Sequence, residues 1–200
     1  MKSNVGIIML ILLVHKYEVT NAQFVKFLND RSNKRDNGVE RIKLDDLSGI
    51  ERDGNRFRVV LGHDLHPVVQ VSWYAARAYC EWVGKRLPNE DEWVQACEGD
   101  NGRMYPWGNV FEANRANVEG LEGRTPTTSY VGQFLMGASP YGVMDMAGNV
   151  WEWTATLGED NTRLVRGGSF NNIPDDVKCS SLLRLAPTER GGNVGFRCVK

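Results

Sequence analysis

The sequence predicts a single α+β domain that is rich in loops, with two to three helices and several short antiparallel strands. Its 200 residues suffice for one well-packed domain, and 42% hydrophobic with 24% charged residues is the balance of an ordinary globular protein. Helical periodicity is confined to short segments before residue 99, whereas most of the 21 glycines come after it. Helical and strand segments do not alternate, which favours α+β over βαβ order.

The first 16 residues are expected to form either an apolar strand or a signal-like segment. An apolar run extends from Gly6 to Val14, well short of the ~20 residues that a membrane-spanning helix needs. Its length suits the core of a secretory signal, but Lys2 is the sole charge before it and no small-x-small cleavage site follows. The β-branched residues in the run favour a buried strand. We expect no transmembrane span and assign residues 17–200 to one domain.

Three segments carry the signals of a helix start. Thr20 with Gln23 forms a capping box, and Asn89 with Glu92 forms another. Ser72 is the expected cap of a helix between these two. The first helix should reach about residue 29, and the middle one should end before the glycine at residue 84.

Strand signals are weaker. Residues 30–56 are polar, with turn signals Asp-Asn-Gly at 36–38 and Asp-Gly-Asn at 53–55, and are expected to form a surface excursion. Residues 164–166 and 194–199 are the expected strands, because both are short apolar runs next to glycine.

Charge excludes two classes of partner. The net charge is −1 and positive and negative residues are interspersed. The chain therefore has no basic stripe for nucleic acid and no polybasic segment for an anionic membrane.

Seven motifs follow one another along residues 17–200. They are Tyr-Glu-Val-Thr-Asn at 17–21, His-Pro-Val at 66–68 with Val-Ser-Trp at 71–73, Gly-Lys-Arg-Leu-Pro at 84–88 with Glu-Trp at 92–93, Tyr-Pro-Trp-Gly-Asn at 105–109, Gly-Asn-Val-Trp-Glu-Trp at 148–153, Arg-Gly-Gly-Ser-Phe at 166–170 and Gly-Phe-Arg-Cys at 195–198. In this order they resemble the formylglycine-generating enzyme family, also called sulfatase-modifying factors. The resemblance implies a variant of the C-type lectin fold.

That family contains several functions on one scaffold. It includes copper-dependent oxidases, sulfoxide synthase domains, siderophore-maturation proteins, kinase-attached modules and the variable proteins of diversity-generating retroelements. The fold therefore does not determine the function.

The copper site of the oxidases is not expected here. In the oxidases a cysteine pair follows the Gly-Gly-Ser turn, and its thiolates bind Cu(I). Residues 170–178 contain no cysteine, and the two positions of the pair fall near Asn172 and Pro174. Neither side chain can replace a thiolate.

The four cysteines match other positions of the family. The resemblance pairs Cys80 with Cys198 and Cys97 with Cys179, whereas the sequence alone allows three connectivities or four buried, reduced thiols. If the disulfides form, export to the periplasm or the extracellular space is favoured; otherwise a cytoplasmic location is.

The resemblance also implies a structural calcium site. Its ligands would be Asp145, the carbonyl oxygens of Gly148 and Val150, and Glu152, since calcium prefers oxygen donors. The alternative is a carboxylate pair in a solvated turn. A second family site would begin at Asn117, but its later acidic ligand is missing from this sequence.

The first functional hypothesis is a non-catalytic ligand- or protein-binding domain, of the kind found in retroelement variable proteins. Its ligand, a protein or a small molecule, would contact the surface of the carboxy-terminal loop where the oxidases hold copper. The expected contact residues are Trp151, Asn171, Asn172, Asp175, Asp176, Ser180, Ser181, Leu182, Leu185 and Glu189.

The alternative hypothesis is a copper-independent enzyme of the family, resembling the siderophore-maturation or sulfatase-modifying proteins. Glu152 or Asp175 would then transfer protons. Ser169 is a weaker candidate, because no histidine lies near it in the sequence to activate it. A third hypothesis is a family member without an activity of its own.

Overall fold

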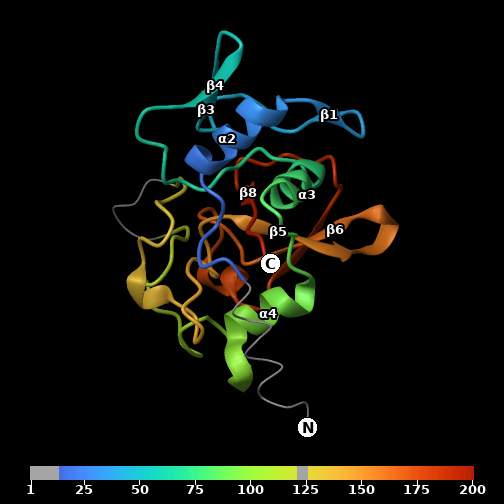
Figure 1. Cartoon of the computed structure of the whole chain (residues 1–200). Helices are drawn as coiled ribbons and strands as arrows, with labels where there is room; N and C mark the ends of the chain where they lie inside the picture. The colour runs from blue at the N-terminus through green and yellow to red at the C-terminus, as the bar shows by residue number, and fades with distance from the viewer. Residues whose placement is uncertain (1–13, 121–125) are drawn as a thin grey trace.

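The computed structural model describes residues 14–120 and 126–200 (Figure 1). The amino-terminal strand or signal-like segment expected at residues 1–16 therefore lies mostly outside the described residues. Its end is described, and Val14 forms an antiparallel bridge with Val199 near the carboxy terminus. Among the described residues, no helix is long and apolar enough to cross a membrane.

The three expected helices are confirmed. They are α2 (Asn21–Arg31), α3 (Trp73–Trp82) and α4 (Glu90–Glu98). Thr20 and Asn89 begin α2 and α4 with reciprocal hydrogen bonds to the glutamine or glutamate three residues later, so both predicted capping boxes are present. Helix α2 continues two residues further than the sequence predicted.

The polar stretch between α2 and α3 contains two small hairpins. Strand β1 (Arg35–Asp36) pairs with β2 (Val39–Glu40), and β3 (Ile50–Asp53) pairs with β4 (Arg56–Val59), both antiparallel. The turn signals in the sequence close both hairpins. Figure 1 shows the β3–β4 hairpin at one end of the molecule, beyond α2.

The central sheet has four strands in the order β7-β6-β5-β8. Strands β6 (Arg163–Arg166) and β8 (Val194–Gly195) were predicted, although β8 is shorter than expected. Strands β5 (Trp151–Leu157) and β7 (Leu182–Leu185) were not predicted. Most strand pairs are antiparallel, as expected, and β8 departs from this pattern because it runs parallel to β5. Residues 186–193 connect β7 to β8, at the opposite edge of the sheet.

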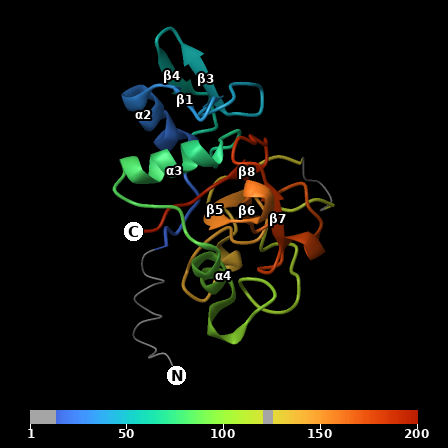
Figure 2. The same ribbon diagram turned by 90° about the vertical axis from the view of Figure 1, so that its right-hand side faces the viewer.

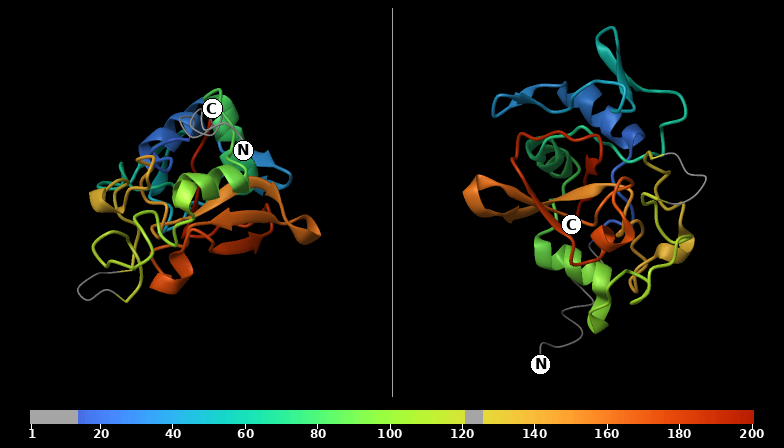
Figure 3. Two further views of the ribbon diagram at one scale, coloured as in Figure 1. Left: turned by 90° about the horizontal axis from the view of Figure 1, so that it is seen from below. Right: turned by 180° about the vertical axis from the view of Figure 1, so that it is seen from behind.

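Little regular structure joins these elements. Figure 3 shows the long connection between α4 and β5, coloured green to orange, as a series of loops. The described residues also contain four short 3₁₀ helices, at Gly99–Asn101, Leu135–Gly137, Glu159–Asn161 and Pro174–Val177.

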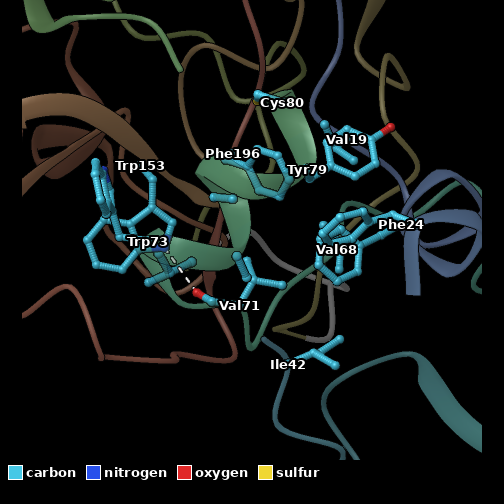
Figure 4. Packing of buried hydrophobic residues seen from close by; sticks show 14 of the residues in the cluster. Val19, Phe24, Ile42, Val68, Val71, Trp73, Tyr79, Cys80, Trp153 and Phe196 are labelled. Atoms are coloured by element: carbon cyan, nitrogen blue, oxygen red, sulfur yellow. Dashed lines mark hydrogen bonds between the residues drawn. The ribbon is translucent and has the colours of Figure 1, made fainter. Parts of the chain in front are cut away.

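The main core lies where α2, α3 and the sheet meet. Helices α3 and α4 both contact β5, and α2 packs on α3 away from the sheet (Figures 1 and 2). Phe24, Tyr79 and Phe196 form an aromatic cluster at this junction (Figure 4). The Trp153 indole is buried there and donates a hydrogen bond to the carbonyl oxygen of Val71, at 3.0 Å.

Two disulfides connect the helices to the carboxy-terminal half. The structure confirms the implied pairing of Cys80 with Cys198 and of Cys97 with Cys179, with Cα–Cα distances of 5.6 and 5.7 Å. All four cysteines are buried. The first bridge joins α3 to the last residues of the chain, and the second joins α4 to the loop before β7.

Removing the Cys97–Cys179 bridge should lower the free energy of unfolding by about 2–4 kcal/mol, because it links positions 82 residues apart. Urea unfolding of a Cys97→Ser/Cys179→Ser double variant measures this loss. A Cys80→Ser/Cys198→Ser variant is the matched comparison, and it should lose at least as much because its separation is 118 residues. An unchanged urea midpoint in the first variant would contradict a formed bridge.

Candidate functional site

A groove lies beside the edge strand β7. Its volume is about 380 Å³, within the usual size range of ligand pockets. Five of its six lining residues are among the contact residues that the sequence predicted, and Leu183 is the one that it missed. The lining residues are Trp151, Asn172, Asp176, Ser181, Leu182 and Leu183.

The turn after β6 fixes one wall of the groove. The buried Ser169 hydroxyl lies 2.6 Å from the side-chain oxygens of both Asn171 and Asn172, and the Ser169 backbone N–H donates to the same Asn172 oxygen. Asn193 donates a further hydrogen bond to the Ser169 hydroxyl. Ser169 therefore orders this turn and has no base beside it.

Glycine is required where this turn packs on the next loop. Gly168 has a φ of +72°, and a Cβ at this position would collide with Val177 and the carbonyl oxygen of Asp176. The close approach brings Asp176 to the groove. A larger residue at 168 would push this wall outward.

Arg166 supports the opposite wall. Its buried guanidinium forms an ion pair with Glu90 in the first turn of α4 and donates hydrogen bonds to the carbonyl oxygens of Ser180 and Ser181, at 2.8 and 3.3 Å. Burial lowers the pKa of Arg166 from its usual value. This arginine links α4 to the chain that enters β7, and the sequence analysis did not single it out.

Five predicted contact residues do not line the groove. Asp175 is exposed and pairs with Lys178 at 2.8 Å, while Leu185 packs against the core. Glu189 is exposed in the loop that follows β7. The full set outside the groove is Asn171, Asp175, Ser180, Leu185 and Glu189.

Sequence reasoning missed Leu183 because it did not recognise β7. The run Leu-Leu-Arg-Leu at 182–185 was the available signal, since a short apolar run before a proline is typical of a strand. In β7, Leu183 is 43% exposed, and its side chain forms part of the apolar lining.

Glu152 lies in a buried ion pair outside the groove. Its two carboxylate oxygens each lie 2.6 Å from a guanidinium nitrogen of Arg197, and the Trp93 indole donates to one of them at 3.0 Å. Both charged side chains are completely buried. Burial alone would lower the pKa of Arg197, but attraction to Glu152 outweighs it and raises the pKa.

Two more carboxylates lie close to this ion pair. Glu18 accepts a hydrogen bond from the Asn149 carboxamide at 2.6 Å, and Asp145 accepts one from the Gly132 backbone N–H at 2.6 Å. Burial raises the pKa of Glu18 well above its usual value, and burial raises the pKa of Asp145 to about 6. Three buried carboxyl groups therefore share one buried guanidinium.

This excess of carboxylates fits the calcium ion that the resemblance implies. The second side-chain oxygen of Glu18 is buried without a hydrogen-bond partner, and a cation would offset the surplus negative charge. The described residues contain no group of three or more Asp, Glu, His or Cys side chains placed to hold a metal. The carbonyl oxygens of Gly148 and Val150 would therefore have to complete the ligand set of Asp145 and Glu152.

Substituting Glu152→Gln should lower the free energy of unfolding by about 3–5 kcal/mol, because the buried Arg197 charge loses the carboxylate that is hydrogen-bonded to it. The control is Glu81→Gln, which removes an exposed ion pair with Arg77 and should cost no more than about 0.5 kcal/mol. Urea unfolding compares the two. Losses of equal size would show that the Glu152–Arg197 pair is not isolated from water.

Comparisons with known proteins agree with this architecture. The family model described as "Sulfatase-modifying factor enzyme 1-like domain" matches residues 9–200. Serine/threonine-protein kinase pkn1 of Chlamydia caviae is 36% identical over 205 residues, which cover 92% of this chain and 32% of the kinase. The inactive C-alpha-formylglycine-generating enzyme 2 of Bos taurus is 39% identical over 151 residues, 66% of this chain and 50% of that protein. This chain thus spans a third to a half of the length of these relatives.

Solved structures share the fold. PvdO from Pseudomonas aeruginosa superposes with a TM-score of 0.71 at 23% identity, covering 92% of this chain and 78% of PvdO. Treponema denticola variable protein 1 gives a TM-score of 0.66 at 20% identity, covering 94% and 84%. The motifs, the disulfide pairs, the α+β architecture and these matches lead to one conclusion: the chain belongs to the sulfatase-modifying factor enzyme 1-like family and has its C-type lectin-like fold.

Proposed function

We propose that this chain is a non-catalytic domain that binds a small molecule or another protein in the groove beside β7. The observation that carries this proposal is the convergence of five predicted contact residues on one groove of about 380 Å³. These residues come from three separate segments, the start of β5, the loop after β6 and the start of β7. A pre-formed groove assembled in this way is typical of a binding site.

The chemistry of the groove suits an amphipathic ligand. Trp151, Leu182 and Leu183 provide apolar surface, while Asn172 and Ser181 provide neutral polar groups. Asp176 is the single charged side chain that lines it. A ligand with an apolar body and a hydrogen-bond donor or a cationic group near Asp176 would match this arrangement.

The cysteines support a role other than copper-dependent oxidation. The loop at residues 170–178 offers no thiolate, and all four cysteines of the chain are joined in buried disulfides. The 39% identity to a bovine protein named as an inactive formylglycine-generating enzyme supports the same view.

Copper(I) titration against a chromophoric chelator, together with thiol counting under denaturing conditions, tests this part of the proposal. We expect no free thiol and no tight one-to-one copper complex, because soft Cu(I) requires accessible sulfur ligands. Tight one-to-one binding together with free thiols would overturn the proposal and restore the oxidase reaction as the leading hypothesis.

A narrower form of the proposal is a variable protein of the retroelement type. The shared fold with Treponema denticola variable protein 1 is compatible with it. Under this proposal, related copies of the chain should differ mainly at Asn172, Asp176, Ser181 and the neighbouring exposed positions. Sequencing such copies is the test, and a nearly unchanged loop across them would count against a diversified site.

The second candidate function is a copper-independent enzyme of the family. The position of Asp176 in the groove favours it, because an enzyme of this kind needs an ionisable group beside its substrate. Of the two acids proposed for proton transfer, Glu152 is held by Arg197 and Asp175 lies outside the groove. Asp176 is exposed and lines the groove, so it would have to act as the acid or base. If an activity is found, an Asp176→Asn variant with unchanged turnover would exclude this role.

We also propose that calcium binds at Asp145 and Glu152 with the carbonyl oxygens of Gly148 and Val150. Adding calcium to chelator-treated protein should raise the Tm, because a ligand that binds only the folded state stabilises it by about 2.7 kcal/mol at 100 times its Kd. The Asp145→Asn variant should lose most of this shift, and magnesium should produce a smaller one. A Tm that does not respond to calcium would rule out the site.

A further inference from the structure

A second cavity lies between the turn that contains His66, the segment around Asn117 and the loop at residues 127–134. Its volume is about 320 Å³, and it shares no lining residue with the groove beside β7. None of its described lining residues is acidic, and none is a lysine or an arginine. They are His66, Asn117, Thr127, Thr128, Ser129, Tyr130, Gln133 and Phe134.

The base of this cavity is held in place by buried hydrogen bonds. The Asn117 side chain is buried and donates to the Thr127 carbonyl oxygen at 2.8 Å and to the Asn149 side-chain oxygen at 3.3 Å. Ser129 donates to that same oxygen from its backbone N–H and from its hydroxyl. The Val131 N–H also bonds the carbonyl oxygen of Leu65. The cavity is therefore pre-formed, which reduces the entropic cost of binding.

The described lining residues include no Asp, Glu, Lys or Arg and are mostly polar. The Nδ1 atom of His66 lies 2.7 Å from the Thr128 hydroxyl, and the His66 ring meets the Tyr130 ring edge-on at 4.8 Å. Burial lowers the pKa of His66 below its usual value, with a smaller effect from His63 in the same direction. The imidazole is thus harder to protonate than an exposed histidine. A charged ligand would find no counter-ion among the lining residues that the structure describes.

Two lining side chains keep free hydrogen-bonding groups. Among the described residues, no side-chain hydrogen bond is formed by the Gln133 carboxamide or the Tyr130 hydroxyl, and both residues line the cavity. Gln133 is exposed, and Tyr130 is 47% exposed. A carboxamide offers both donors and an acceptor in one plane, and an aromatic ring offers an apolar face beside them. Together they match a compound that carries several hydroxyl groups on an otherwise apolar ring.

We propose that this cavity binds a neutral, polyhydroxylated small molecule of about the size of one sugar ring. The volume lies at the lower end of the range of ligand pockets, which is roughly 300–1,000 Å³. The described lining residues offer no charged group to a phosphorylated or acidic compound, and their hydroxyl and carboxamide groups disfavour a purely apolar one. This site is independent of the groove and of the function proposed for it.

Saturation-transfer NMR with titration calorimetry provides the first test. The probes are D-glucose, D-galactose, D-mannose and N-acetyl-D-glucosamine, each applied to the full chain. We expect at least one of them to bind with a Kd of about 1 mM. D-glucuronate should bind at least about tenfold more weakly, because the described lining residues offer its carboxylate no counter-ion. No binding by any neutral sugar up to about 50 mM, or equal binding of glucuronate, would overturn the proposal.

Variants of two lining residues test whether the sugar binds in this cavity. Gln133→Ala and Tyr130→Phe each remove one free polar group at an exposed position without touching the buried hydrogen bonds, and each should weaken binding of the sugar about tenfold. Ser181→Ala, which alters the other groove, is the matched control and should leave the affinity unchanged. If the sugar still binds equally to both cavity variants, or if Ser181→Ala abolishes binding, the ligand does not occupy this cavity.

Discussion

The buried ion pair of Glu152 with Arg197 is the constraint on which the rest of the fold depends. Glu152 lies in β5, and Arg197 lies in the segment after β8. The same guanidinium donates to backbone carbonyl oxygens of three residues elsewhere in the chain. A buried charge that loses its partner costs several kcal/mol, so these segments are stable only when they come together. The three acceptors are His15, Lys16 and Met144.

This arrangement also determines which side chain of β5 is available for binding. Successive residues of a strand point to opposite faces. Glu152 turns toward Trp93 and Arg197, whereas Trp151 and Trp153 both join the core cluster that contains α2 and α3. Trp151 belongs to that cluster and also lines the groove. The ion pair thus removes the carboxylate from the binding surface and leaves an indole there.

The sequence predicted local features better than distant ones. Both capping boxes were found because each uses hydrogen bonds between residues three positions apart. The partner of Glu152 was not found, because Arg197 is 45 residues away and a single sequence contains no signal for such a contact. Strand β8 was placed, but its parallel pairing with β5 depends on the path of residues 186–193, which connect it to β7. The disulfide pairing was available only through the family resemblance, and the groove required β7, which the sequence analysis missed.

Asn149 explains why one scaffold can keep its shape while its binding surfaces change. Its side chain forms hydrogen bonds with Glu18, one of the three buried carboxyl groups, and with Asn117 and Ser129 at the base of the second cavity. Its backbone carbonyl oxygen accepts the N–H of Phe170, in the turn that leads to the groove. Asn149, in the Gly-Asn-Val-Trp-Glu-Trp motif of residues 148–153, therefore connects the buried carboxylates with the supports of both binding surfaces, and one other residue of that motif, Trp151, lines the groove itself. A match to that motif predicts the fold, whereas the ligand depends on exposed side chains such as Asp176 and Gln133, whose identity the motif does not restrict.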